Sequence, residues 1–467
     1  MGKTIDNGSK EKRLYRIVLP NADNELKKRC LVAAVEKYGE MLPEVVMERL
    51  SVELNAVKEN GYASHYLIGS MMAEKSKENG YRAITRGLLG SAFMAYLCGI
   101  SVVNPLPAHY WCPDCHYFEP ADADHRTMGY DLPGKKCPQC GAGMRGEGAN
   151  IEPEILMGIK LDREPDIILN VASEIRPVLI EYIKGVFGED CVYRAGVKVF
   201  LDDGSIRRNV HPGGVFIVPT DVDISEITGL RDEIPKDDFC LKVTEEDCHK
   251  IDGILKKYDI LTLPELGMLK KLEDKTGFHS DDIGTNDEEV MSVFQREAFS
   301  FLPGHKRDTG ESITDKAVRI SRPRCFSELV KLTAMMHGVG TWKDNGEQLI
   351  QSGKSLRECI ACRDDIMQDL ISAGMVRKRA YEIMDRVRKG KGVTDEMSWD
   401  MHLSGVSDWY INSCTKITYL YPKAHAADYM LLYWKLAYYK LHYPDEYRQV
   451  LFEAEEESAL HLATKIE

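Results

Sequence analysis

Four cysteines, arranged as two Cys-x-x-Cys pairs, carry the clearest chemical signal in the sequence. The pairs are Cys112–Cys115 and Cys137–Cys140, with residues 116–136 between them. Each pair lies in a turn rich in proline and glycine, so each can present two thiolates to one tetrahedral metal ion. The spacing predicts a structural zinc site, because four protein ligands leave no position open for a substrate. Four unrelated surface cysteines, or His116 as a ligand, are the alternatives.

A third pair of this kind, Cys359 and Cys362, falls within a helical pattern and has no second pair to complete a metal site. We interpret these two residues as buried thiols. The chain has 13 cysteines, an odd number, and its N-terminus carries no secretion signal. Reduced thiols or metal ligands are therefore expected rather than disulfides.

A cluster of basic residues in the last third of the chain is the next candidate for chemistry. It consists of Arg377, Lys378, Arg379, Arg386, Arg388, Lys389 and Lys391. Gly390 and Gly392 interrupt it, and glycine lets backbone N–H groups approach phosphates closely. The cluster suits contact with a nucleic acid or a triphosphate, although without further context a solvated helix face is the simpler explanation.

The elements that must position these residues follow from periodicity. Apolar residues at helical spacing predict helices over 24–80, with Pro43 at a helix start. Residues 81–85 predict a strand that leads into a glycine turn. Strands alternate with helices between 154 and 262, and from about 285 the pattern is mostly helical. The clearest strands are 165–171, 215–219 and 256–261, whereas residues 108–148 and 303–316 are loop-like.

Composition and charge place only loose limits on the class of protein. The net charge of −13 argues weakly against a nucleic-acid binder, but duplex contact needs only a local basic face. With 467 residues the chain is long enough for two or three domains. No apolar run reaches the ~18 residues of a membrane span. We therefore expect a cytoplasmic protein without a membrane partner.

Several motifs, in a fixed order along nearly the whole chain, together resemble PolC-type DNA polymerase III, the family C alpha subunit. They are YGEMLPEVVMERLSVELN (38–55), SVVNPLPAHYWCPDC (101–115), DLPGKKCPQCG around the second cysteine pair, FGEDCVYRAG (187–196), HPGG (211–214), CFSELVKLTAMMHG (325–338), CRDDIM (362–367), VRKGKG (387–392) and YPKAHAADY (421–429). The resemblance covers the family's palm and fingers only. Its exonuclease, histidinol-phosphatase-like domain, accessory nucleic-acid-binding domains and clamp-binding tail have no counterpart, so a sliding clamp is not an expected partner.

The resemblance implies an α+β fold with a nucleotidyltransferase palm of the polymerase-beta kind, a zinc-binding loop insertion and a mostly helical fingers domain. Residues 1–107 would form N-terminal helices and the first part of the palm. Residues 108–150 would form the zinc-binding insertion. Residues 151–270 would complete the palm, with a reduced thumb, and residues 271–467 would form the fingers.

The palm of this family resembles other nucleotidyltransferases in holding two magnesium ions on three aspartates. Two come from a Pro-Asp-Ile-Asp strand and the third from an Asp-Ile-Leu strand. Asp166 and Asp259 match the first and third, but Ile168 stands at the second position and offers no oxygen. Two carboxylates are expected to hold one magnesium ion weakly rather than a pair. Glu265 is an unconventional ligand that would complete the site.

The family's phosphate cradle, Gly-Ser-Arg-Gly-Ser-Val-Gly-Ser-Ser, corresponds to residues 84–92. Hydroxyls are replaced at Leu88 and Ala92, and the family's HGTDVW loses its acid in residues 337–342. By resemblance, residues that would contact nucleotide or DNA are Arg86, Gly87, Gly90, Ser91, Arg388, Lys389, Lys391, Lys423 and His425.

The thumb that grips duplex DNA is the largest departure. Between Gly196 and His211 the family carries tens of residues of helix, whereas this chain has only VKVFLDDGSIRRNV. Alternation at Val197, Val199 and Leu201, followed by the turn signal Asp202–Ser205, predicts a short β-hairpin there. A polymerase lacking the helical grip should hold primer–template poorly.

Three functions remain open from the sequence. The first is a catalytically impaired polymerase homologue, a pseudoenzyme that binds primer–template or single-stranded DNA, or a replication partner. The second is a DNA-directed DNA polymerase of reduced activity that uses deoxynucleoside triphosphates in replication or repair. The third is a structural module that binds protein through the zinc loop and helical half.

Overall fold

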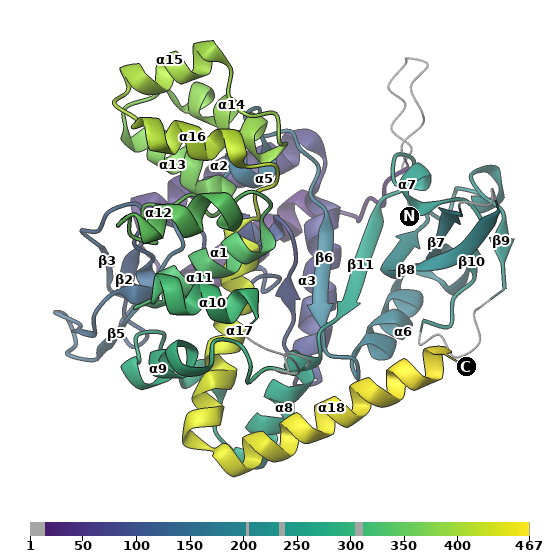
Figure 1. Cartoon of the computed structure of the whole chain (residues 1–467). Coiled ribbons are helices and arrows are strands. Elements are labelled where there is room, and N and C mark those ends of the chain that lie inside the picture. Colours follow the sequence, from purple (N-terminus) through teal and green to yellow (C-terminus); the bar gives the residue numbers. More distant parts are fainter. Residues whose placement is uncertain (1–14, 202–204, 233–238, 304–311, 467) are drawn as a thin grey trace.

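The computed structural model describes residues 15–201, 205–232, 239–303 and 312–466 (Figure 1). Within these residues a seven-stranded mixed sheet and a separate four-stranded sheet are flanked by N-terminal helices and a helical C-terminal half. The expectation of an α+β fold is confirmed.

The N-terminal part is helical, as predicted over 24–80. Its helices are α1 (Ala22–Tyr38), α2 (Glu44–Asn60) and α3 (Ala63–Glu78), and a short α4 (Phe93–Leu97) follows. Pro43 directly precedes α2, where its missing N–H leaves no hydrogen bond unmade. Helix α3 packs closely on the large sheet: a Cβ added to Gly69 would lie 3.3 Å from a methyl group of Ile167.

The large sheet has the strand order β1-β6-β11-β8-β7-β10-β9. Its strands are β1 (Ile84–Thr85), β6 (Ile167–Val171), β7 (Val192–Phe200), β8 (Ile206–Ile217), β9 (Leu230–Arg231), β10 (Val243–Thr244) and β11 (Lys257–Thr262). Strands β6 and β11 are parallel and pair in register over their whole common length. The strands predicted at 165–171 and 256–261 are confirmed, and the one predicted at 215–219 begins within the longer β8. Helices α6 (Arg176–Phe187) and α7 (Cys248–Ile251) connect them.

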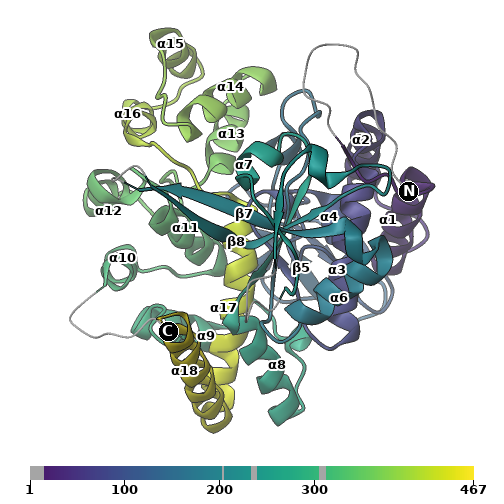
Figure 2. The same ribbon diagram turned by 90° about the vertical axis from the view of Figure 1, so that its right-hand side faces the viewer.

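Strands β7 and β8 form the predicted hairpin. They pair antiparallel from Val192 and Ile217 out to Phe200 and Ile206. The turn residues 202–204 lie outside the described part of the chain. Figure 2 shows the two strands extending from the sheet toward the side on which the helical half projects.

Residues 108–148 are more regular than the loop expected from the sequence. They contain the second sheet, with strands β2 (His109–Trp111), β3 (Phe118–Pro120), β4 (Lys135–Lys136) and β5 (Gly143–Glu147). Strand β2 pairs with both β3 and β5. Strands this short show no clear alternation of apolar and polar residues, so the sequence pattern missed them. A short helix, α5 (Glu154–Met157), leads back to the large sheet.

The helical half is arranged around the long helix α17 (Lys423–His442), which contacts α8, α9, α11 and β1. Its other helices are α8 (Pro264–Thr276), α9 (Glu288–Glu297), α10 (Ile313–Ser321), α11 (Phe326–His337), α12 (Glu347–Gln351), α13 (Arg363–Ser372), α14 (Arg377–Arg388), α15 (Asp395–Leu403), α16 (Asp408–Lys416) and α18 (Pro444–Ile466). The mostly helical pattern predicted from residue 285 is confirmed. Among the described residues, none of the helices has both the length and the apolar character needed to span a membrane.

Gly129 lies against the backbone of β5 and supports the first testable prediction. A Cβ added there would lie 1.7 Å from the carbonyl oxygen of Glu147. We expect Gly129→Ala to lower the free energy of unfolding by about 2 kcal/mol, because the backbone must move. Urea unfolding measures the effect. Gly134→Ala is the matched control, since its Cβ would meet no atom within 4 Å. Equal losses in both variants would contradict the packing.

A buried carboxyl between α17 and β1 makes stability depend on pH. Burial raises the pKa of Asp428 to about 7, although its oxygen accepts a hydrogen bond from the Thr85 hydroxyl. Between about pH 4 and 7 the native state therefore still holds a proton on Asp428 that the unfolded chain has already released. The free energy of unfolding falls as pH rises through that window. The loss is at most on the order of 4 kcal/mol.

We expect Asp428→Asn to flatten this pH dependence. The measurement is the urea midpoint of wild type and variant at pH 5 and pH 8. The wild type should lose more stability than the variant between the two. An equal pH response of the two proteins would contradict the assignment.

Candidate active site and metal centre

Asp259 and Ile168 are direct neighbours on two parallel strands. The ladder between β11 and β6 pairs these two residues, so their side chains leave the same face of the sheet about 5 Å apart. Asp166 precedes Ile168 by two positions and lies directly before β6. The Asp259 side chain is 6% exposed, whereas that of Asp166 is 76% exposed. The three predicted metal-ligand positions are thus adjacent, with an alkyl group between two carboxylates.

Each of the two carboxylates has a lysine partner. The Lys257 ammonium lies 2.5 Å from Oδ2 of Asp259, and the Lys256 ammonium lies 2.9 Å from Oδ1 of Asp166. The other oxygen of Asp259 is buried without a hydrogen-bond partner among the described residues, 3.5 Å from Nδ1 of His211. The fixed charges of this face therefore cancel pairwise, and neither lysine was recognised from the sequence.

Glu265, the proposed substitute ligand, is buried in the first turn of α8. Its charge adds to burial in raising the pKa of Tyr433 on α17 and of Tyr447 on α18. This carboxyl thus lies near the tyrosines of the last two helices.

The turn after β1 brings part of the predicted phosphate cradle to the palm. The Arg86 backbone N–H donates to the carbonyl oxygen of Ile168 (3.0 Å), which fixes this exposed residue beside the aspartate strands. Gly87 has a φ of +79°, a conformation that favours glycine. Gly90 and Ser91 are fully buried, and a Cβ added to Gly90 would lie 3.2 Å from Ala424 on α17. Only Arg86 and Gly87 of the four predicted residues reach the surface.

The start of α17 meets this turn. His425 is buried and stacks on Tyr421, and burial together with the charge of Arg86 lowers the pKa of His425 to about 3. The Tyr429 hydroxyl accepts a hydrogen bond from the Asn170 side chain on β6 (3.2 Å). Sequence reasoning missed Tyr421 and Tyr429 as site residues, although both belong to the YPKAHAADY motif.

Lys423, predicted to face a nucleotide, is buried at the first position of α17. Its backbone N–H donates to a carboxylate oxygen of Asp364 (3.1 Å), and its charge opposes the effect of burial on the pKa of Asp364. The enclosed Lys423 ammonium therefore stabilises the Asp364 carboxylate before it can serve an external phosphate.

Acids of α14 itself and of other segments neutralise most of the basic cluster. Asp385 pairs with both Arg388 (2.5 Å) and Lys389 (2.6 Å). Arg377 pairs with Glu152 and Glu154, and Arg379 with Glu382, Glu396 and Asp400. Lys378 and Lys391 are exposed and make no ion pair within the described residues. Arg386, half-buried, likewise makes no ion pair within the described residues, so the two lysines are the exposed members of the cluster that stay unpaired there.

The two cysteine pairs come together at one end of the small sheet. Cys112 and Cys140 have their sulfurs 3.4 Å apart, those of Cys115 and Cys137 are 3.5 Å apart, and all four lie within 4.8 Å of one another. Tetrahedral thiolates around one zinc ion would be about 3.8 Å apart, so the donor set fits a single such ion. His116 instead directs Nδ1 to the carbonyl oxygen of Lys37 (3.2 Å). Cys359 and Cys362 are both buried, as interpreted.

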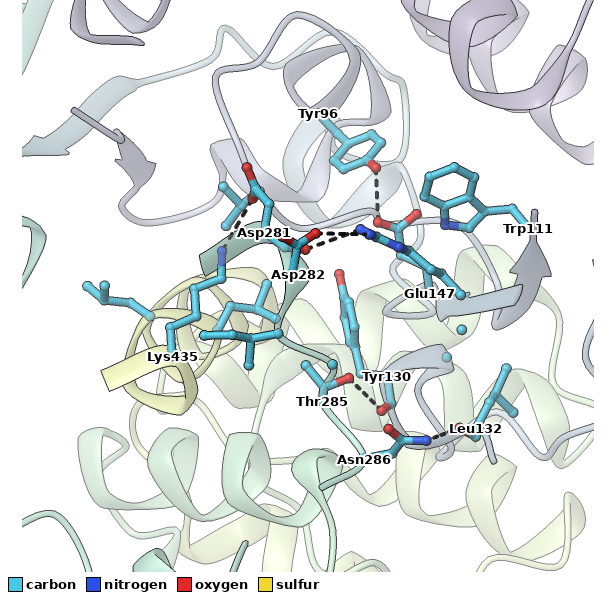
Figure 3. Close-up of a pocket in the computed structure, with 18 of the residues that line it drawn as sticks. Tyr96, Trp111, Tyr130, Leu132, Glu147, Asp281, Asp282, Thr285, Asn286 and Lys435 are labelled. Carbon is cyan, nitrogen blue, oxygen red and sulfur yellow. Dashed lines mark hydrogen bonds and ion pairs between the residues drawn. The ribbon is translucent and has the colours of Figure 1, made fainter. Parts of the chain in front are cut away.

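A cavity of about 670 Å³ lies between the small sheet, residues 281–286 and α17 (Figure 3). On its wall Glu147 accepts hydrogen bonds from the Tyr96 hydroxyl (3.0 Å) and ion-pairs with Lys37 (2.9 Å). No motif pointed to this cavity, because its walls come from segments far apart in the sequence. None of the residues that the sequence predicted as metal ligands or as nucleotide or DNA contacts lines it.

Comparison with known proteins relates both halves of the chain to replicative polymerases. The family described as "Bacterial DNA polymerase III alpha NTPase domain" matches residues 24–206, and "Bacterial DNA polymerase III alpha subunit finger domain" matches residues 263–406.

Curated relatives are similar over nearly the whole chain. Proteins named "DNA polymerase III PolC-type" are 37% identical in Caldanaerobacter subterraneus subsp. tengcongensis (93% of this chain, 34% of the relative), 35% in Thermotoga maritima (95% and 36%) and 36% in Staphylococcus aureus (92% and 33%). The chain thus spans about a third of the length of these relatives. By these matches, the chain belongs to the PolC-type DNA polymerase III family.

Proposed function

We propose that this chain binds primed or single-stranded DNA with a polymerase-beta-like palm and that its template-directed nucleotidyl transfer is lost or severely impaired. In this proposal residues 1–107 and 151–270 form the palm, residues 108–150 the zinc-binding insertion and residues 271–467 the fingers. The observation that carries the proposal is the pairing of Ile168 with Asp259 at the centre of the palm face.

The ligands on this face do not fit a pair of magnesium ions. Two hard cations close together need several anionic oxygens. Ile168 supplies none, and Lys256 and Lys257 already neutralise the two carboxylates that remain. A magnesium ion would have to displace an ammonium at 2.5 Å from Asp259 without gaining the third carboxylate.

DNA binding requires fewer groups in the site than nucleotide transfer does. Phosphate contact needs cations and backbone N–H groups but no metal. Arg86 is exposed beside the aspartate strands, and Lys378 and Lys391 are exposed on the fingers. A face whose carboxylates are neutralised by lysine also repels phosphate less than three uncompensated aspartates would.

The retained position of Asp166 and Asp259 favours one second candidate, an active polymerase of reduced rate. Both carboxylates occupy adjacent strands with Arg86 next to them, as catalysis in this family requires. In that case one ion would be held by the two aspartates, and deoxynucleoside triphosphates would be substrates.

Primer extension separates these two candidates. We expect purified protein with primer–template, four deoxynucleotides and magnesium or manganese to give no extension above background, because the second carboxylate is absent. Ile168→Asp should raise manganese affinity, measured by isothermal titration calorimetry, by about tenfold without restoring extension, since the thumb is also reduced. Asp259→Ala is the control. Extension by the wild type that Asp259→Ala abolishes would establish the enzyme and overturn the proposal.

The four-thiolate cluster is proposed to hold one structural zinc ion. We expect native mass spectrometry to find one zinc per chain, and Cys137→Ser to lose it and to lower the melting temperature by several degrees, because metal binding is coupled to folding of the insertion. Cys191→Ser, outside the cluster and only partly buried, is the matched control and should keep the metal. Metal content unchanged by Cys137→Ser would exclude the site.

A further inference from the structure

The outer part of the β7–β8 hairpin exposes apolar side chains that the other described residues leave uncovered. This part, residues 197–201 and 205–210, is called the arm below. Phe200 is 73% exposed and Ile206 is 51% exposed, and Val199 and Leu201 are exposed beside them. Exposed apolar residues on a protruding strand pair favour aggregation unless a partner covers them. The exposed apolar residues of the arm therefore indicate a binding partner.

The pairing register sorts the side chains of the arm onto two faces. Phe200 pairs with Ile206 and Lys198 pairs with Arg208, and these two pairs are two residues apart along both strands. They therefore share one face, with the apolar pair further from the sheet and the basic pair nearer to it. The opposite face carries Arg207, paired with Val199. Each face combines apolar and basic groups.

The charge of the arm has the sign that suits nucleic acid. Arg207 and Arg208 are exposed and make no ion pair within the described residues, whereas Lys198 pairs with Glu246 (3.0 Å). The sequence 197–210 contains three basic residues and two acids, Asp202 and Asp203, which gives it a charge of +1 in a chain of −13. The guanidinium groups of Arg207 and Arg208 are therefore available to bind an external anion.

The arm continues from the strand that pairs with Asp259, and its outer end at Ile206 lies about eight residues, or roughly 27 Å, further along it. Strand β8 runs from the arm through His211 to Gly214, and Gly214 pairs with Asp259. Figure 2 shows the strands leaving the sheet on the side of the helical half. A strand of DNA that lies on the palm face and continues past β8 reaches the arm.

We infer that the arm binds single-stranded DNA next to a primed end, with Phe200 stacked on an unpaired base and Arg208, on the same face, in contact with a phosphate. An aromatic side chain and cations at this spacing are the usual means of holding an unpaired strand. A duplex hides the faces of its bases, so it would leave Phe200 and Ile206 exposed. This inference rests on the proposed DNA-binding function and names the form of DNA that one part of the protein contacts.

Fluorescence anisotropy with three labelled oligonucleotides tests the inference: a single strand, a blunt duplex and a primed template with a single-stranded overhang. Phe200→Ala should weaken binding of the single strand and the overhang about 5- to 100-fold and leave the blunt duplex unchanged. Arg208→Gln should reduce the slope of log affinity against log salt for the single strand by about 0.7, whereas Arg207→Gln, on the opposite face, should leave it unchanged.

Matched controls use exposed residues far from the arm. Phe452→Ala on α18 removes an exposed aromatic ring, and Lys27→Gln with Lys28→Gln on α1 removes two exposed cations. Both should bind like the wild type. Phe200 is exposed, so Phe200→Ala should keep the wild-type melting temperature. In Phe200→Trp, the added indole fluorescence should be quenched by the single strand and not by the duplex.

The outcomes distinguish failure of the inference about the arm from failure of the proposed DNA-binding function. If the wild type binds DNA and Phe200→Ala binds all three oligonucleotides as tightly as the wild type, the arm inference is overturned and the proposed function stands. A protein partner would then account for the exposed apolar residues of the arm. If Phe200→Ala weakens single strand and duplex alike, the assignment to unpaired DNA is overturned. A wild type that binds none of the three overturns the proposed function itself.

Discussion

The register between β6 and β11 is the constraint on which the palm depends. Because the two strands are parallel and pair residue for residue, position 168 must lie beside Asp259, whatever side chain it carries. An aspartate there would put two carboxylates about 5 Å apart, a distance that only a bound cation makes favourable. Ile168 removes that repulsion. The sheet therefore keeps Asp259 at its place on β11 while position 168 offers no second carboxylate for a cation.

Helix α17 ties the helical half to this sheet through buried polar contacts. Asp428 accepts a hydrogen bond from Thr85 on β1, and Tyr429 accepts one from Asn170 on β6. Polar groups this deeply buried are costly to leave unsatisfied, so the contacts fix the rotation of α17 about its own axis. The same rotation encloses His425, which Arg86 and burial keep neutral. Residues beside His425 in the YPKAHAADY motif thus hold the two halves together.

Local patterns in the sequence predicted the helices, the buried strands, the hairpin and the cysteine pairs, because each depends on residues close together in the chain. The partners of the charged residues were not predictable in this way. Arg377 pairs with Glu152 and Glu154, more than two hundred positions away, and Lys423 lies against Asp364. The basic cluster consequently looked more cationic in sequence than it is in space. Burial of Gly90 under Ala424 was hidden for the same reason: only the tertiary packing of α17 decides it.

Charge compensation supports the proposal that this acidic protein holds DNA on the face that carries Asp166 and Asp259. Three aspartates without metal would repel phosphate. Here one aspartate is absent and lysines neutralise the other two, so the face is close to neutral before any ion binds. Binding by cations such as Arg86 then requires no metal, whereas transfer still requires the pair of ions that this face is unsuited to hold. In the proposed function, the substitution that would impair catalysis would therefore leave DNA binding intact and independent of magnesium.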